Sequence, residues 1–451
     1  MRQQSSRGVL TARRFVTRTW RSGLAAMGTV LLLGVAARPA AAVTCAVDPV
    51  PAATLLLPFF EVDLGNPNRL TTLFSINNAL TSAILAHVVI WSDLSVPVMS
   101  FDVYLTGYDV QTINMRDIIV FGNLPQTASF GQDTFGTISP KGPLSQGINF
   151  ASCQNVLPPK ALPPTFLQHL QLSLTGKPSP LLQAQCAGRD LGDNIARGYI
   201  TVDTVRNCTL RVPGDAGYFG ADSTADVTDQ NALWGNWYIV DVPQSYVLGS
   251  TMVGIEADAS NPATSTPGRY TFYGRYDGWS AVDHREPLAS TFAAQFFSSE
   301  AGAGLFDAGT DLIVWRDPKG AQQPFACPAA ANVQPQWYPL GMEGLVIFDE
   351  SETPAVPQTV AFCPQPPTAP FIPFPAATQA VRAGGPTLAV PFHFGWMYVD
   401  LNVSAVYNPA PPIDTAAAQA YVISAHVANG HAVAVDAYRL DSSCNTGHVV
   451  P

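Results

Sequence analysis

The sequence predicts a mainly β protein with an antiparallel β-sandwich architecture. Residues 70–114 hold three or four consecutive segments of strand length. Within them, residues 101–106 alternate apolar and polar side chains, which predicts one face in a core and one toward water. Residues 84–91 carry apolar side chains on both faces, which predicts a central strand covered twice. The 39 Pro and 35 Gly residues are typical of a turn-rich β protein outside the cell.

The chain of 451 residues is long for a single core, so we expect two packed sandwich-like units with long loops and one short helix. The C-terminal strands can complete an earlier sheet, because strands from different segments of the chain commonly pair in sandwiches. We divide the chain into a signal peptide at 1–42, an N-terminal β-sandwich unit at 43–160, a central β-rich unit at 161–363, a Pro-rich linker at 364–376 and C-terminal strands at 377–451.

The first strand is expected at residues 53–62, where Pro58 marks an edge or a bulge. Residues 164–174 are the helix candidate, since Thr165 stands near the start and Gly176 follows the end. Short apolar or alternating runs between turn residues predict further strands at 198–205, 236–242, 250–257, 269–275, 291–297, 311–315, 344–348 and 392–401.

The chain is expected to end in a β-hairpin formed by residues 421–427 and 432–440. The dipeptide Asn429-Gly430 between them favours a tight two-residue turn. That turn would set Ala428 opposite His431.

The first 42 residues have the features of a cleaved export signal. A leader rich in Arg precedes an uncharged apolar run at 24–36, and small residues follow at 40–42. The run is too short to span a bilayer comfortably, so no transmembrane anchor is expected after cleavage. Without this segment, which holds seven Arg and no acid, 16 basic and 33 acidic residues remain, a net charge of −17. An acidic chain repels phosphates, so we do not expect nucleic acid as a partner.

Seven cysteines lie after the leader, and none forms a Cys-x-x-Cys motif. In the periplasm or outside the cell they are expected to form disulfides, with one cysteine left over. The local pairings Cys186–Cys208 and Cys327–Cys363 are the first candidates, each closing a loop of some tens of residues.

Four stretches suggest relatives: residues 101–112, 283–288, 309–317 and 395–401. In these stretches the chain resembles a group of exported bacterial proteins that have no assigned function. The resemblance implies an exported, bacterial, β-rich protein, and it implies no activity, cofactor or partner.

The densest polar cluster is formed by Asp283, His284, Arg285 and Glu286. An acid, a base and a cation together could serve acid–base catalysis, with Asp283, His284 and Glu286 as the catalytic candidates and Arg285 as a binding residue. Adjacent charges are also common in turns, where Arg285 would pair with its acidic neighbours. The sequence lacks the usual signatures of serine hydrolases, zinc proteases and nucleotide-binding loops, so we do not expect an enzyme with those motifs.

Two further groups of residues could bind ligands. Asp222, Asp226 and Asp229 could supply oxygen atoms to calcium, although their spacing is not that of a calcium loop, and a solvated acidic loop is the alternative. No other cofactor is expected. Trp234, Trp237 and Trp279 could stack on sugar rings if exposed, or pack in the core.

The sequence therefore predicts an exported, non-enzymatic β-sandwich protein with a structural or binding role in the cell envelope or outside the cell. Its partner would be a glycan or an envelope protein. Two alternatives stay open: a secreted hydrolase with its site at residues 283–286, and a carbohydrate-binding surface module.

Overall fold

The computed structural model describes residues 50–125, 161–220, 224–278, 280–298, 309–318, 323–327, 344–355, 374–401, 419–428 and 431–440. All of them belong to the second of two compact units, Val43–Pro451. The first unit, Met1–Ala42, lies outside the described residues, and so does the export signal predicted there. Most of the expected Pro-rich linker at 364–376 also lies outside them.

The protein is mainly β and contains four open antiparallel sheets in its described residues. Sheet 1 has the order β10 (Val253–Ile255), β1 (Thr54–Asp63), β6 (Ile195–Val205), β3 (Ile84–Ser92) and β4 (Pro97–Leu105). Sheet 2 has the order β5 (Val110–Asn114), β2 (Leu70–Asn78), β8 (Asn236–Asp241) and β9 (Tyr246–Thr251), and β7 (Leu233–Trp234) also pairs with β2.

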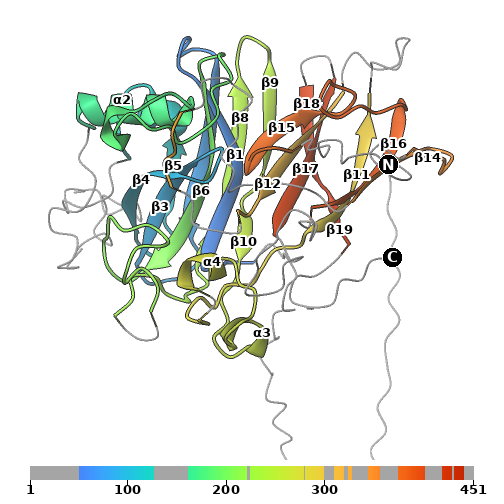
Figure 1. The fold of residues 1–451 in the computed structure, drawn as a ribbon. Helices are drawn as coiled ribbons and strands as arrows, with labels where there is room; N and C mark the ends of the chain where they lie inside the picture. The colour runs from blue at the N-terminus through green and yellow to red at the C-terminus, as the bar shows by residue number, and fades with distance from the viewer. Residues whose placement is uncertain are drawn as a thin grey trace, which may run out of the picture. The chain divides into compact units, whose positions relative to one another are not determined.

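The second half of the chain forms the other two sheets (Figure 1). Sheet 3 has the order β14 (Pro354–Ala355), β13 (Gly344–Asp349), β16 (Phe394–Asp400), β11 (Thr291–Phe297) and β19 (Tyr438–Arg439). Sheet 4 has the order β15 (Thr378–Arg382), β12 (Thr310–Arg316), β17 (Ala420–Ala428) and β18 (His431–Asp436). The domain boundaries drawn from composition stay a prediction.

Helices are few and short in the described residues. They are α1 (Met115–Ile119), α2 (Pro164–Leu174), the 3-10 helix η3 (Pro180–Leu182), α3 (Pro262–Ser265) and α4 (Gly274–Asp277). None of the described helices is long and apolar enough to cross a membrane.

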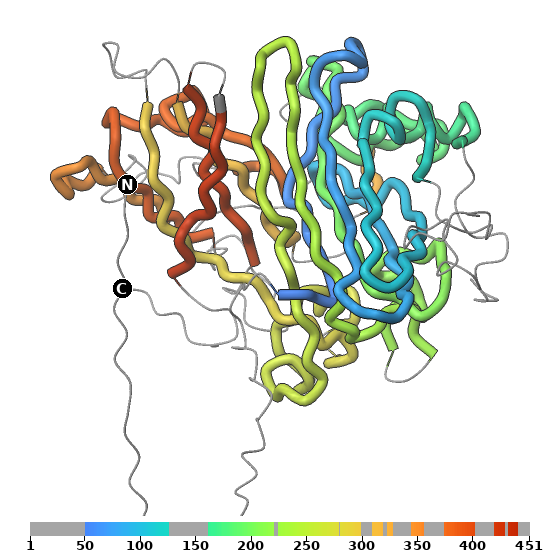
Figure 2. Tube along the Cα trace, turned by 180° about the vertical axis from the view of Figure 1, so that it is seen from behind, coloured from blue at the N-terminus to red at the C-terminus, as the bar shows by residue number. Residues whose placement is uncertain are grey.

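Two hydrophobic cores hold the sheets together, and β12 contributes to both. Leu312 and Val314 pack in the core between sheets 3 and 4. The alternate residues Ile313 and Trp315 pack in the larger core formed by sheets 1 and 2. Successive side chains of a strand point to opposite faces, so a strand buried on both faces can join two cores. The outer strands of sheets 2 and 4, β9 and β18, also lie side by side (Figure 2).

Several expectations are confirmed where the local pattern decides the structure. Strand β3 is buried along its whole length, as expected of a strand covered twice. Helix α2 spans Pro164–Leu174, the range expected for it. In the C-terminal hairpin, Ala428 is opposite His431. The register of β1 with β6 shifts around Pro58, which confirms a bulge there.

The prediction that β4 has a solvent-facing side is wrong. Asp102 and Tyr104 are buried, because residues 206–220 and 224–228 cover this face of sheet 1. Asp102 accepts hydrogen bonds there from the backbone N–H of Thr209, at 2.8 Å, and forms a 2.8 Å contact with His87 Nδ1. A loop that reads as polar and exposed therefore covers the sheet.

Two other segments differ from expectation. Residues 269–275 form no strand, since the backbone N–H of Tyr273 donates to the Asp283 carboxylate instead of to a strand partner. Helix α1 was not expected; it begins after Asn114, whose side chain accepts the backbone N–H of Arg116.

The disulfide pairing expected from short loops is wrong. Cys186 bonds to Cys327, 141 residues away, with the Cα atoms 5.0 Å apart. Backbone hydrogen bonds between Cys186 and Phe325, of 2.9 and 3.0 Å, bring the two segments together. Cys208 is also disulfide-bonded, and Cys363 lies outside the described residues. Sequence distance therefore does not select the partner of Cys186.

Candidate functional site

The cluster at residues 283–286 centres on a buried arginine. Arg285 and Asp283 are fully buried. The Arg285 guanidinium lies 3.5 Å from the Asp203 carboxylate and 3.4 Å from that of Asp283. It also donates to Thr54 Oγ1 and, at 3.1 Å, to the carbonyl of Thr228. The guanidinium thus joins β1, β6 and two loops.

Two tyrosines complete this network around Asp203. The hydroxyls of Tyr218 and Tyr273 donate to Asp203 Oδ2 at 2.6 and 3.0 Å. Burial raises the pKa of both tyrosines well above the ordinary value, so both hydroxyls stay protonated donors. Burial also raises the pKa of Asp283, and Arg285 partly offsets this rise. The arrangement satisfies its own polar groups and is typical of an internal structural network.

Of the three catalytic candidates, only His284 reaches the surface. Its Nδ1 lies 2.6 Å from Asp229 Oδ2, and this hydrogen bond raises the pKa of His284. Burial acts to raise the pKa of Asp229, but the bond to His284 outweighs it and leaves that pKa below the ordinary value. Asp283 and Glu286 are buried, at 0% and 6% exposure, and Arg285 is buried as well. This placement weighs against substrate contact, and the acid–base site stays a prediction.

The expected calcium ligands are engaged separately. Asp226 accepts a 3.0 Å hydrogen bond from Arg211, and Asp229 pairs with His284. Asp222 lies outside the described residues. Within the described ranges, no group of three or more acidic, His or Cys side chains could hold a metal ion.

The three tryptophans proposed for stacking are placed differently. Trp237 is fully buried in the larger core, so it offers no surface to a ligand. Trp279 lies outside the described residues. Trp234 is 44% exposed and lies at the outer face of sheet 2. Tyr238, four residues further along, is 45% exposed.

The alternation of β7 and β8 places Trp234, Asn236 and Tyr238 on one face. Trp234 is opposite Asn77 of β2, and Tyr238 is opposite Leu73, in one continuous register. The two aromatic residues are about 13 Å apart along the strand, at about 3.3 Å per residue. They form two ends of an aromatic platform on the outside of the sheet.

Two glycines shape this platform. Tyr238 is paired with Gly249 of β9, and a Cβ atom at Gly249 would lie 2.2 Å from Cδ1 of the Tyr238 ring. The ring therefore lies over the glycine, with its other side turned away from the sheet. A Cβ at Gly235 would lie 2.2 Å from the carbonyl oxygen of Ser75, so only glycine lets β7 and β8 continue closely along β2.

A groove of about 610 Å³ runs across this outer face. Its lining includes small polar side chains, among them Ser75, Asn77, Thr112 and Asn236, and the apolar side chains of Leu73, Phe74, Val110 and Ile113. Asn77 is buried, and its Oδ1 has no hydrogen-bond partner among the described residues. A buried acceptor without a donor costs about 1–3 kcal/mol. Among the described residues, the lining contains Asp117 and no cationic side chain.

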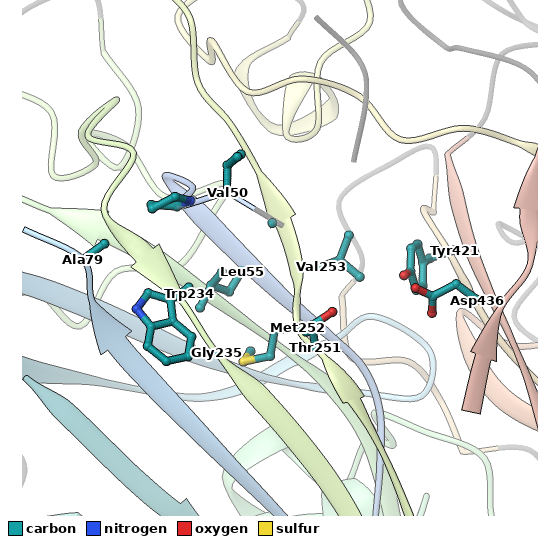
Figure 3. A pocket seen from close by; sticks show the side chains of 12 residues that line it. Val50, Leu55, Ala79, Trp234, Gly235, Thr251, Met252, Val253, Tyr421 and Asp436 are labelled. Carbon is teal, nitrogen blue, oxygen red and sulfur yellow. The ribbon is translucent and has the colours of Figure 1, made fainter. Parts of the chain in front are cut away.

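A second cavity, of about 470 Å³, is also lined by Trp234 (Figure 3). Its walls are mainly apolar and include Leu55, Met252 and Val253. Tyr421 and Asp436 lie across the cavity from Trp234 (Figure 3). Trp234 lines both cavities, so the groove and this pocket are neighbours.

Sequence reasoning named Trp234 but missed how the other groove residues come together. The order Trp234-Gly-Asn236-Trp-Tyr238 places aromatic and polar residues at every second position, which is a sequence signal for one shared face. Gly249 and Asn77 could not be found in this way, because their roles arise from pairing with distant strands.

Comparisons with known proteins add no relative. No family model matches the chain, and searches of the curated proteins and of the solved structures found no match.

Proposed function

We propose that this chain is an exported, non-enzymatic β-sandwich protein of the cell envelope or the extracellular space, and that it binds a glycan on the outer face of sheet 2. One observation supports this most directly: the exposed rings of Trp234 and Tyr238 flank a groove whose lining mixes apolar side chains with hydroxyl and amide groups.

The groove has the chemistry that a sugar requires. A pyranose ring presents apolar C–H groups on its faces and hydroxyls around its rim. The C–H faces pack on aromatic rings, and the hydroxyls need donors and acceptors such as Thr112 and Asn236. An exposed aromatic patch with a polar rim is the usual mark of a binding surface.

The charge of the groove favours a neutral ligand. Asp117 lines one part of it, and among the residues that the structure describes the lining includes no Lys, Arg or His. An anionic sugar or a phosphate would meet the Asp117 carboxylate without a cation from these residues, which is unfavourable. A neutral oligosaccharide is therefore the ligand class that we propose.

A glycan array followed by calorimetry tests the proposal. We expect neutral oligosaccharides to bind, and Tyr238→Ala to weaken the affinity about fivefold, since one aromatic contact contributes about 1 kcal/mol. Gly249→Val should weaken it similarly, because the new side chain would displace the Tyr238 ring. Tyr438→Ala is the matched control, since Tyr438 is 65% exposed on sheet 3.

Two results would overturn the proposal. One is an array without hits. The other is a loss of affinity in Tyr438→Ala as large as that in Tyr238→Ala, which would show that the platform contributes nothing specific.

A further inference from the structure

We infer that the glycan bound by this protein carries an acyl chain: the sugar occupies the groove of sheet 2, and the chain enters the neighbouring apolar pocket. This inference rests on the proposed function and names its ligand class more closely. It follows from the position of Trp234, which lines both cavities. A ligand that extends past Trp234 from the groove reaches the pocket next.

The walls of the pocket suit a hydrocarbon. Leu55, Met252 and Val253 are at most 5% exposed, and Ala79 and Val50 add further apolar surface. A sugar ring packed against these apolar walls would bury hydroxyls away from the polar lining residues Thr251, Tyr421 and Asp436, and each unpaired hydroxyl costs free energy. At about 470 Å³, the pocket is also larger than one methyl or acetyl group needs, and its size is within the range of small-molecule sites.

The charge at the pocket excludes the simplest alternative lipid. Asp436 lines the pocket and accepts a hydrogen bond from the Tyr421 hydroxyl. Among the described residues, Asp436 is the one charged side chain in the lining. The carboxylate of a free fatty acid inside the pocket would therefore meet the like charge of Asp436, whereas a neutral sugar head group would not. The chain is thus expected to arrive attached to the sugar.

Alkyl maltosides of increasing chain length, used below their micelle concentrations, test the inference, with maltose as the head group alone. We expect the affinity to rise about fourfold for each added methylene until the pocket is full, as burial of hydrocarbon predicts. Sodium decanoate should bind more weakly than decyl maltoside, which has the same chain length.

Matched variants separate the two halves of the site. Val50→Glu places a carboxylate in the pocket wall and should reduce the gain per methylene; Val247→Glu is the control, because Val247 is 50% exposed and lines neither cavity. Tyr238→Ala should weaken every alkyl maltoside by the same factor without changing the gain per methylene.

The outcomes distinguish the inference from the proposed function. Glycan binding that does not depend on chain length would overturn the inference of an acyl chain and leave the glycan proposal intact. Equal effects of Val50→Glu and Val247→Glu would also overturn it, and so would decanoate binding as tightly as decyl maltoside. If Tyr238→Ala weakens no ligand, the sugar half fails and the proposed function fails with it.

Discussion

Arg285→Met tests whether the buried network is a structural element. Arg285 is fully buried and neutralises two carboxylates, those of Asp203 and Asp283, which are fully buried too. Methionine has a similar length and keeps most of the packing, so the main loss is the cation. Removing one partner of a buried ion pair costs about 3–5 kcal/mol, because the other partner is left charged and uncompensated. We expect a loss of unfolding free energy in that range.

The control is the same change at an exposed ion pair. Arg382 pairs with Asp311 at 2.7 Å, but its side chain is 42% exposed. Exposed pairs contribute about 0–1 kcal/mol, so Arg382→Met should lower stability by no more than that. Urea denaturation followed by tryptophan fluorescence measures both variants under the same conditions.

The stability loss caused by Arg285→Met should depend on pH. Burial holds the pKa of Asp283 above the ordinary value, and removing Arg285 would raise it further. A carboxyl group whose pKa is higher in the folded state favours folding at low pH and loses that contribution as pH rises. The penalty of Arg285→Met should therefore shrink on acidification, and adding Asp283→Asn should recover part of it at neutral pH.

Two results would refute this reasoning. One is a loss of stability for Arg285→Met no larger than that for Arg382→Met. The other is a penalty that stays constant with pH and is not reduced by Asp283→Asn.

Two further predictions concern the disulfide and the surface histidine. Replacing Cys186 and Cys327 with Ser should lower the unfolding free energy by about 5 kcal/mol on the entropy model for a loop of this length; urea denaturation measures it, and a mapped peptide that joins Cys186 to Cys208 would contradict the pairing. The pKa of His284 is raised by Asp229, so this pair stabilises the fold fully below pH 6.5 and less as pH rises through the pKa of the folded state. Asp229→Asn should lower that pKa in an NMR titration and flatten the pH dependence of stability there; an unchanged pKa would rule the pair out.

The sequence by itself determined the features that depend on local pattern. The helix at Pro164–Leu174 could be predicted because its ends carry their own signals, and the C-terminal hairpin because Asn429-Gly430 fixes a register. The apolar character of both faces of β3 likewise predicted its burial. Each of these features depends on a short stretch of neighbouring residues.

Only the tertiary structure decided which faces and which partners those elements have. Asp102 reads as a solvent-facing residue of β4, yet a segment some hundred residues later covers it. Arg285 reads as a turn residue, yet it neutralises Asp203 on a distant strand. The alternation places Trp234 and Trp237 on opposite faces of the strand, but only the packing of the sheets decides that Trp237 is buried and Trp234 is exposed. A two-residue period assigns side chains to two faces, whereas the segments that cover each face come from far along the chain.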